Sequence, residues 1–289
     1  MADSQDAAPL RGVLLCLTAL LLFSLLDATA KHLSVFLAVP LLVWARYLVH
    51  LLIMLATIAP SLGRELVVTR RPWLMSLRGL TLAGVTLLGQ LALRVLPLAE
   101  ATALFFVAPL LVALLAGPLL GERVRRRAWL ATFAGFAGVL LIARPGNALT
   151  GPGVAYALAA ALCYAAYQIL TRKLVASESP LRLLFYTALI GTLVLSPAVP
   201  ISWDGRLPTL GQGLQIVSLG VYGGLGHFLL IRAFRETPAS LLSPLLYVQL
   251  VWATLLGWLV FDQLPDLVAT VGMAVIAASG LSLALRRRG

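Results

Sequence analysis

The sequence has few charged residues: Asp, Glu, Lys and Arg make up 11% of its 289 positions, whereas 61% are hydrophobic. A soluble domain is roughly a quarter charged, so the composition indicates an integral membrane protein. The net charge of +11 would suit nucleic acid only if the basic residues covered one face of a soluble fold. Because the arginines form short clusters between apolar runs, nucleic-acid binding is excluded.

Cysteine and histidine are also scarce. The two cysteines, Cys16 and Cys163, lie in separate apolar runs without the paired spacing of a disulfide framework or a metal site. The three histidines are scattered, and the sequence contains no phosphate-binding loop. We therefore expect no metal, no cofactor and no catalytic residues, and ATP is not expected as the direct energy source.

Long apolar runs recur along the whole chain. A transmembrane helix needs about 20 apolar residues, and continuous runs favour helices over the alternating strands of a membrane barrel. The polar, acidic N-terminus lacks the basic start and cleavage site of a signal peptide, so the first run is expected to stay in the membrane. The ten predicted spans lie near residues 12–34, 36–59, 73–93, 97–119, 129–144, 152–174, 180–199, 211–233, 238–261 and 266–285.

The basic residues indicate how these spans are oriented. If the N-terminus is cytoplasmic, 16 of the 22 lysines and arginines lie in cytoplasmic segments, which is a strong positive-inside signal. Trp73 and Trp129 each follow an arginine cluster, as anchors at a membrane interface do. We predict an all-α integral membrane protein with both termini cytoplasmic. The 16 residues are Arg11, Arg64, Arg70, Arg71, Arg123, Arg125, Arg126, Arg127, Arg172, Lys173, Arg182, Arg232, Arg235, Arg286, Arg287 and Arg288.

The sequence also matches itself weakly, at an offset near 140. The two repeats, 12–144 and 152–285, would each contain five spans. Because an odd number of spans reverses the direction of the second repeat, we predict two inverted repeats with the substrate site near the midplane between them. The aligned pairs include Gly12 with Gly153, Phe23 with Tyr164, Asp27 with Gln168, Lys31 with Arg172, Pro40 with Pro180, and Glu122 with Asp262.

Several motifs resemble those of the drug/metabolite transporter superfamily, in its ten-helix, two-repeat EamA type. "FSLLDATAK" places Lys31 at the family's lysine position, "VWARYLV" contains Arg46 of the second helix, and Pro109 with "LLGERV" resembles the end of the fourth helix. The resemblance implies alternating access in the inner membrane, often as export, with aromatic or other neutral amino acids as substrates. The sequence departs from the family pattern at Phe23-Ser24, Gln249 and Phe261-Asp262.

Polar and aromatic residues inside spans are costly unless they face a cavity or a partner helix. Tyr164, Tyr167 and Gln168 share one helix face because they are three and four residues apart. Gln90 and His227 correspond in the repeat, and each follows a glycine. Packing between helices remains the alternative for all of these residues, and His227 has a proton-carrying role as a further alternative. The predicted substrate-binding residues are Asp27, Gln90, Phe105, Tyr164, Tyr167, Gln168, His227, Tyr247, Gln249 and Trp252.

Asp27 and Lys31 are one helical turn apart within the first apolar run. An ion pair at this spacing contributes only about 0.2–0.5 kcal/mol in water, well below the roughly 2.5–3.5 kcal/mol penalty of one charge at the bilayer centre. Lys31 could also extend to the outer headgroups. We predict that Asp27 borders a water-filled pathway and that Lys31 lies near its outer end.

Transport is the function that these features favour. The alternative is a membrane enzyme that acts on a lipid-linked substrate, which would need paired carboxylates, His-Asp groups or metal ligands near a membrane face. A sensor would carry a soluble signalling domain, and the loops are too short for one. The expected partners are a small-molecule substrate and membrane lipids. We expect a monomer because the two repeats can complete a pathway by themselves.

Overall fold

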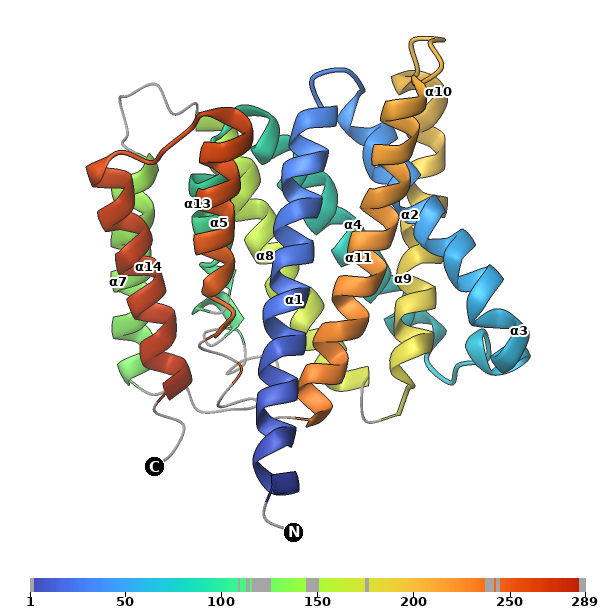
Figure 1. Ribbon diagram of the computed structural model, residues 1–289, viewed down its shortest axis with the longest axis horizontal. Helices are drawn as coiled ribbons and strands as arrows, with labels where there is room; N and C mark the ends of the chain where they lie inside the picture. Colours follow the sequence, from blue (N-terminus) through green and yellow to red (C-terminus); the bar gives the residue numbers. More distant parts are fainter. Residues whose placement is uncertain are drawn as a thin grey trace.

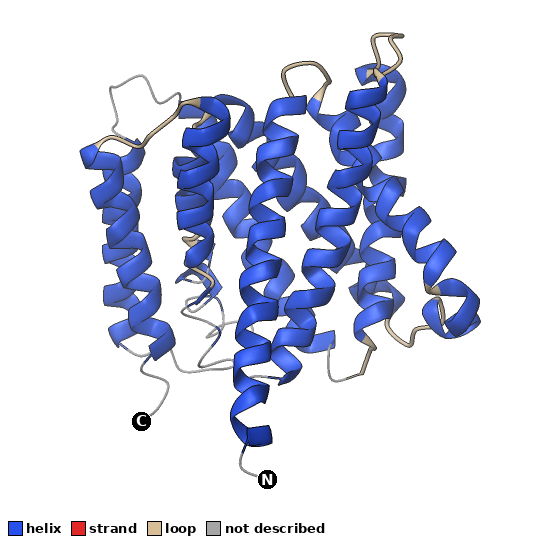
Figure 2. Cartoon of the chain, viewed as in Figure 1, coloured by secondary structure: helices blue, strands red, loops and turns tan. Residues whose placement is uncertain are grey.

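The computed structural model describes residues 3–108, 110–112, 115, 126–143, 151–174, 177–236, 242 and 245–285. Within these ranges the chain is helical, with short turns and loops between helices and no strands (Figure 2). Pro109 and the segments 121–125 and 286–288 of the sequence analysis lie outside the described residues. The helices are α1 (Asp3–Leu33), α2 (Val39–Thr57), α3 (Ala59–Leu62), η1 (Gly63–Leu66), α4 (Pro72–Val95), α5 (Leu98–Phe105), α7 (Arg126–Ala143), α8 (Gly151–Leu174), α9 (Pro180–Leu195), η2 (Ser196–Ala198), α10 (Val199–Ser202), α11 (Leu210–Glu236), α13 (Val248–Phe261) and α14 (Leu267–Leu285).

Six helices in the described residues are long and apolar enough to cross a membrane. Four shorter apolar helices coincide with the remaining predicted spans, so the count of ten stays a prediction. The six long spans are Leu10–Leu33, Val39–Thr57, Pro72–Val95, Gly151–Leu174, Pro180–Ser202 and Leu210–Ala233. Three of these are Phe133–Ile142, Val248–Phe261 and Leu267–Ser279, and the fourth is an apolar segment that begins with α5 at Leu98.

The long helices stand side by side in one bundle, and α1 begins at the same end of it at which α14 ends (Figure 1). Helix α1 packs against α11, α4 against α8, and α7 against α14, while α2 lies between α9 and α11. Helix α5 packs against α8 and α13. Helices from the two halves of the chain are therefore interleaved rather than separated into two bundles.

Equivalent helix contacts occur in the two halves of the chain. A Cβ added to Gly79 of α4 would lie 2.8 Å from Ile190 Cβ of α9, and one added to Gly220 of α11 would lie 2.7 Å from Val49 Cβ of α2. The two contacts are equivalent: Gly79 corresponds to Gly220, and Val49 corresponds to Ile190, each at a shift of 141 positions. Two apolar clusters are related in the same way: Leu33 and Leu42 in one, Leu174 and Leu183 in the other.

The paired helices run in opposite directions. Gly153 at the start of α8 lies against Leu96 just after the end of α4, and Thr171 near the end of α8 contacts Arg78 near the start of α4. Arg11 near the start of α1 likewise lies 3.4 Å from Glu236 at the end of α11. The exchange of partners between halves, together with these directions, is the packing expected of an inverted repeat.

Two helices are interrupted at equivalent places. Helix α5 ends at Phe105, and the turn at 106–107 separates it from further helical residues, so the predicted span 97–119 is not one continuous helix. Helix α13 begins only at Val248, after the turn at 246–247, whereas a span beginning near 238 was predicted. At each turn the backbone cannot form all the i to i−4 hydrogen bonds of a regular helix. Some backbone N–H and C=O groups inside the bundle are therefore available to other partners.

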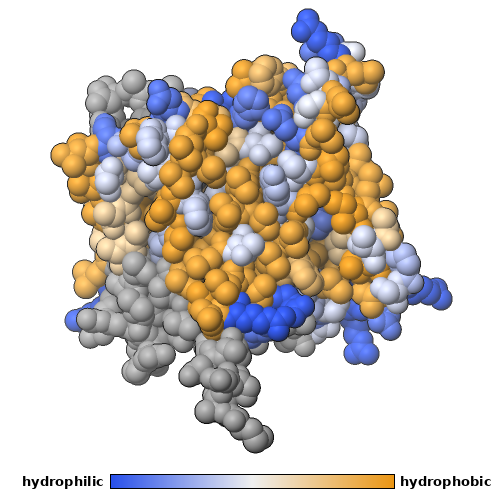
Figure 3. Space-filling view, viewed as in Figure 1, coloured by the Kyte–Doolittle hydropathy of each residue, from blue (hydrophilic) through white to orange (hydrophobic). Residues whose placement is uncertain are grey.

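The surface agrees with a membrane location. Figure 3 shows apolar residues over the middle of the visible face and hydrophilic residues near both ends of the helices. Trp73 at the start of α4 and Trp129 near the start of α7 are 75% and 49% exposed, as side chains at a membrane interface would be. Gly220 and Gly224 pack against α2, which is the close approach that small residues permit.

Candidate functional site

The two helix interruptions meet inside the bundle. The rings of Phe106 and Tyr247, one from each turn, have centroids 5.0 Å apart. The Tyr247 hydroxyl is buried and has no hydrogen-bond partner among the described residues. Ala28 of α1 belongs to the same buried cluster as Phe106 and Leu250. The interruptions therefore lie against the part of α1 that carries Asp27.

Asp27 and Arg46 place opposite charges in the interior. Both side chains are half-buried, and Arg46 is the basic residue whose charge acts on Asp27. In the described part of the chain neither forms an ion pair or a side-chain hydrogen bond. Gly223 of α11 makes room for the guanidinium, because a Cβ there would lie 3.3 Å from Arg46 Nε.

Lys31 does not pair with Asp27, so that alternative is wrong. Its ammonium group donates to the Leu93 carbonyl at 2.6 Å and to the Leu96 carbonyl at 2.5 Å, and it lies 5.5 Å from the centre of the Phe261 ring. Only 8% of Lys31 is exposed, so the residue does not extend to the headgroups. A cation is favourable there because the end of a helix carries negative carbonyl dipoles.

Three of the predicted aromatic residues form a continuous wall. Phe105 of α5 lies 4.9 Å from Tyr164 of α8, and Tyr164 stacks on Tyr167 at 5.7 Å with 17° between the ring planes. Arg78 of α4 donates to the Tyr167 hydroxyl at 2.6 Å. The shared helix face predicted for Tyr164 and Tyr167 is present, and it carries these aromatic contacts.

His227 and Trp252 both lie against Phe23 of α1. The His227 ring lies 4.9 Å from the ring of Phe23, and a Cβ at Gly226 would lie 2.7 Å from Phe23. Trp252 packs in the same cluster as Phe23, and its indole Nε1 is buried without a hydrogen-bond partner among the described residues. Unsatisfied buried donors are uncommon in folded proteins, so each one is a candidate contact for a ligand.

The three predicted glutamines differ in their surroundings. Gln90 of α4 is 4% exposed, and its side-chain carbonyl oxygen has no partner within the described ranges. Gln168 and Gln249 are half-buried. The helix-packing contacts align the two halves of the chain at a shift of 141 positions. At this shift His227 corresponds to Thr86 and not to Gln90.

Arg46, His50 and Arg78 also belong to this interior, although none was among the predicted binding residues. His50 is 8% exposed and lies beside Gly224, and Arg78 is 3% exposed. The charges of Arg46 and Arg78 act on His227. The signal that could have identified the arginines was their position inside apolar spans, where an ionisable residue usually has a function.

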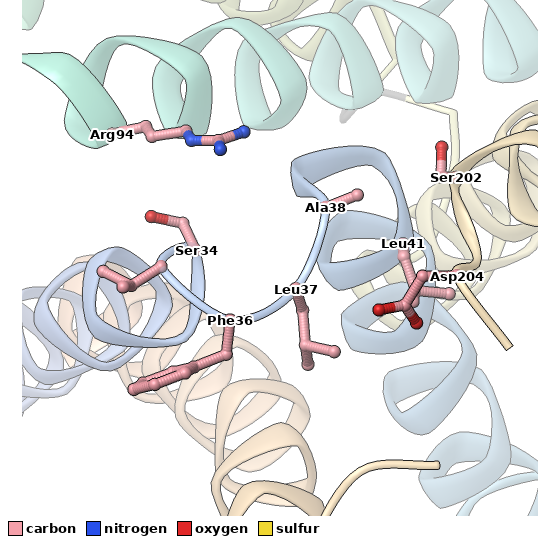
Figure 4. A pocket seen from close by; sticks show the side chains of 9 residues that line it. Ser34, Phe36, Leu37, Ala38, Leu41, Arg94, Ser202 and Asp204 are labelled. Carbon is pink, nitrogen blue, oxygen red and sulfur yellow. The ribbon is translucent and has the colours of Figure 1, made fainter. Parts of the chain in front are cut away.

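Two pockets lie outside this interior. One of about 240 Å³ is at the helix ends, and Figure 4 shows Arg94 and Ser34 on one side of it and Ser202 and Asp204 on the other. A second pocket of the same volume opens between α1, α11 and α13, and it is lined by Leu25, Ala28, Thr29, His32, Gln215, Leu256 and Val260. No predicted binding residue lines either pocket.

A bundle of apolar helices that encloses charged and aromatic residues is the construction of a multi-pass membrane transporter. The described residues contain no group of His, Cys, Asp or Glu that could hold a metal ion. The sequence model of the EamA-like transporter family matches residues 10–144 and again residues 151–285. The chain belongs to this family of the drug/metabolite transporter superfamily, and it is an inner-membrane transporter rather than an enzyme.

Individual relatives agree with the family. The chain is 31% identical to an S-adenosylmethionine uptake transporter of Rickettsia bellii over 76% of this chain and 75% of the relative. It is 29% identical to the pseudopaline exporter CntI of Pseudomonas aeruginosa over 96% of this chain and 97% of that protein. A crystal structure 23% identical in sequence superposes with a TM-score of 0.67 over 96% of this chain and 99% of the other, which shows a shared fold.

Proposed function

We propose that this protein moves a small metabolite with an amino-acid group across the membrane by alternating access. The observation that carries the proposal is the meeting of the two helix interruptions at Phe106 and Tyr247. Interrupted helices at equivalent positions of inverted repeats are typical of transporter binding sites, since freed backbone groups can contact a substrate there.

The charges suit a zwitterion. Asp27 can receive an ammonium group and Arg46 a carboxylate, and neither is already neutralised by an ion pair among the described residues. An ionised group without a partner is costly inside a membrane protein unless water or a ligand contacts it. The Tyr247 hydroxyl and the Trp252 indole Nε1 add buried donors that no described residue uses.

The repeat supports the transport mechanism. We propose ten transmembrane helices arranged as two inverted repeats, 12–144 and 152–285, with both termini cytoplasmic. Rocking of one repeat against the other would expose the central site to each side in turn. One such unit is sufficient for a complete pathway, so the proposed working unit is a monomer.

The substrate and the direction follow from different arguments. Amino acids and S-adenosylmethionine both carry an ammonium and a carboxylate, and a relative is named for uptake of S-adenosylmethionine. Resemblance to amino-acid exporters and to the pseudopaline exporter supports export. We therefore propose export as the direction and a zwitterionic metabolite as the substrate.

Proteoliposomes provide the test. Labelled phenylalanine, a neutral aliphatic amino acid and S-adenosylmethionine would be followed into and out of vesicles, with and without a pH gradient. We expect saturable flux of at least one of them, and we expect Asp27→Asn to lower it at least about tenfold. No saturable flux of any of the three in either direction would refute the proposed substrate class.

A further inference from the structure

Arg78 is buried near the start of α4, and its hydrogen-bond partners among the described residues are all neutral. Its Nε donates to Thr171 Oγ1 at 2.7 Å, Nη1 donates to the Leu183 carbonyl and to Thr187 Oγ1 at 2.9 Å each, and Nη2 donates to the Tyr167 hydroxyl at 2.6 Å. In the part of the chain that the structure describes, no carboxylate forms an ion pair with it. Its positive charge is therefore oriented but not neutralised.

These contacts fix the direction of each hydrogen bond. Thr171 and Thr187 donate their hydroxyl hydrogens to the carbonyls of Tyr167 and Leu183, so they can only accept from Arg78. Arginine has no acceptor atom. The Tyr167 oxygen must therefore accept from Arg78, which leaves the hydroxyl hydrogen of Tyr167 available to donate. No described residue accepts that hydrogen.

The fold does not require this polar cluster. The positions shifted by 141 from Arg78, Tyr167 and Thr171 are Leu219, Leu26 and Ala30, and these three form an apolar cluster in the equivalent contact between α1 and α11. A buried charge is usually no more stabilising than a well-packed apolar replacement. Because the same packing is achieved without charge in the other half, a structural need alone does not explain Arg78.

The cluster also borders the interior that holds the other candidate residues. Tyr167 stacks on Tyr164, which faces Phe105, and the charge of Arg78 acts on His227 of α11. Arg46 and Arg78 together outnumber the one carboxylate, Asp27, among these central residues. This excess of positive charge favours a ligand group that is anionic.

We infer that the Tyr167 hydroxyl donates a hydrogen bond to the carboxylate of the transported molecule, and that Arg78 is the positioning residue that orients this donor. The inference deepens the proposed function and rests on it. Hydrogen bonds to charged groups are stronger than neutral ones. Contact with Arg78 polarises the Tyr167 O–H bond and further strengthens it as a donor.

The binding test compares ligands with and without a carboxylate. Phenylalanine with phenethylamine, and S-adenosylmethionine with its decarboxylated analogue, would be titrated into purified protein while thermal stabilisation is followed. We expect Tyr167→Phe to weaken binding of the carboxylate ligand about tenfold and to change binding of the decarboxylated ligand less than about twofold. Tyr186→Phe is the matched control, since its hydroxyl bonds to the Val67 carbonyl away from the interior.

A double-mutant cycle tests the role of Arg78. If Arg78 acts through Tyr167, Arg78→Gln weakens carboxylate binding about as much as Tyr167→Phe does, and the double variant is no weaker than either. Thr187→Val removes one acceptor at little change in volume and replaces Arg78→Gln if that variant does not fold. Equal weakening of both ligands by Tyr167→Phe, or additive effects, would overturn the inference and leave transport itself intact.

A ligand-free measurement separates the two proposals. The Raman Fermi doublet of tyrosine reports whether a hydroxyl accepts or donates, and the difference between wild type and Tyr167→Phe isolates Tyr167. We expect the pattern of an acceptor in wild type and its loss in Arg78→Gln. A donor pattern in ligand-free wild type would refute the arrangement. If wild type binds none of the four ligands, the carboxylate contact and the proposed function both fail, whatever the Raman result.

Discussion

The Lys31 ammonium group lies 2.5 Å from the carbonyl oxygen of Leu96 and 2.6 Å from that of Leu93, at the end of α4. The Leu93 carbonyl would normally accept from the backbone N–H four residues later, but residue 97 is proline and has none. Lys31 therefore supplies a donor that the helix itself cannot. The contact also joins α1 to α4, within the first half of the chain.

Replacing Lys31 by methionine should lower the free energy of unfolding by about 1–3 kcal/mol, the usual cost of leaving a buried polar group unsatisfied. Thermal unfolding of purified protein in detergent micelles would measure it. Lys173→Met is the matched control, because Lys173 is the only other lysine and is exposed in the last turn of α8. Equal melting temperatures for the two variants would show that the carbonyl contacts contribute nothing measurable.

The role of Lys31 shows what the sequence could and could not predict. Helix spacing correctly placed Asp27 and Lys31 one turn apart, and an ion pair between them was one explanation. The actual partners of Lys31 are more than sixty residues away in sequence and are backbone atoms, which carry no signature in the residue types. The apolar spans and the repeat could be predicted from the sequence, because they depend on composition and periodicity along the chain.

Asp27→Asn and Arg46→Gln should each lower the rate of saturable transport at least about tenfold if both charges contact the substrate. Both variants should change the melting temperature less than they change transport, because neither charge has an ion-pair partner to lose among the described residues. Flux in proteoliposomes and thermal unfolding would be measured together. Asp204→Asn and Arg206→Gln are controls, since these charges are 59% and 90% exposed. Normal flux in both interior variants would refute a role in binding.

The surroundings of the glycines in α4 and α11 predict which Gly→Ala substitutions lower the stability of the fold. Gly220→Ala would place a Cβ 2.7 Å from Val49 Cβ, and Gly79→Ala would place one 2.8 Å from Ile190 Cβ. Overpacking of this kind costs about 1–3 kcal/mol, so both variants should unfold at lower temperature. Gly89→Ala is the control in α4, because nothing lies within 4 Å of the added Cβ.

Gly89→Ala should instead leave stability unchanged or raise it by up to about 1 kcal/mol, since alanine favours a helix over glycine. Destabilisation of all three variants by the same amount would mean that the close contacts do not decide the outcome. The sequence alone could not distinguish a glycine in a filled contact from one beside open space. That distinction depends on which helix lies opposite.

Glu178, in the connection between α8 and α9, predicts a dependence of stability on pH. Its carboxylate accepts from Thr69 Oγ1 and from Arg182 Nη1, each at 2.5 Å, and its side chain is 1% exposed. Burial alone would raise the pKa of this carboxyl, but the hydrogen bonds from Thr69 and Arg182 and the charge of Arg182 outweigh it and hold the pKa below 4.5. The ionised form is thus favoured by folding.

A carboxyl whose pKa is lower in the folded than in the unfolded protein stabilises the fold above its unfolded pKa, and that contribution disappears as pH falls through the folded value. Wild type should therefore lose stability as pH falls below about 4.5, and Glu178→Gln should lose less over the same interval while being less stable at neutral pH. Melting temperatures across that interval would measure this. Glu65→Gln, which changes an exposed carboxylate in the nearby η1, should follow wild type. An unchanged pH dependence in Glu178→Gln would show that the loss of stability in acid arises at other carboxyl groups.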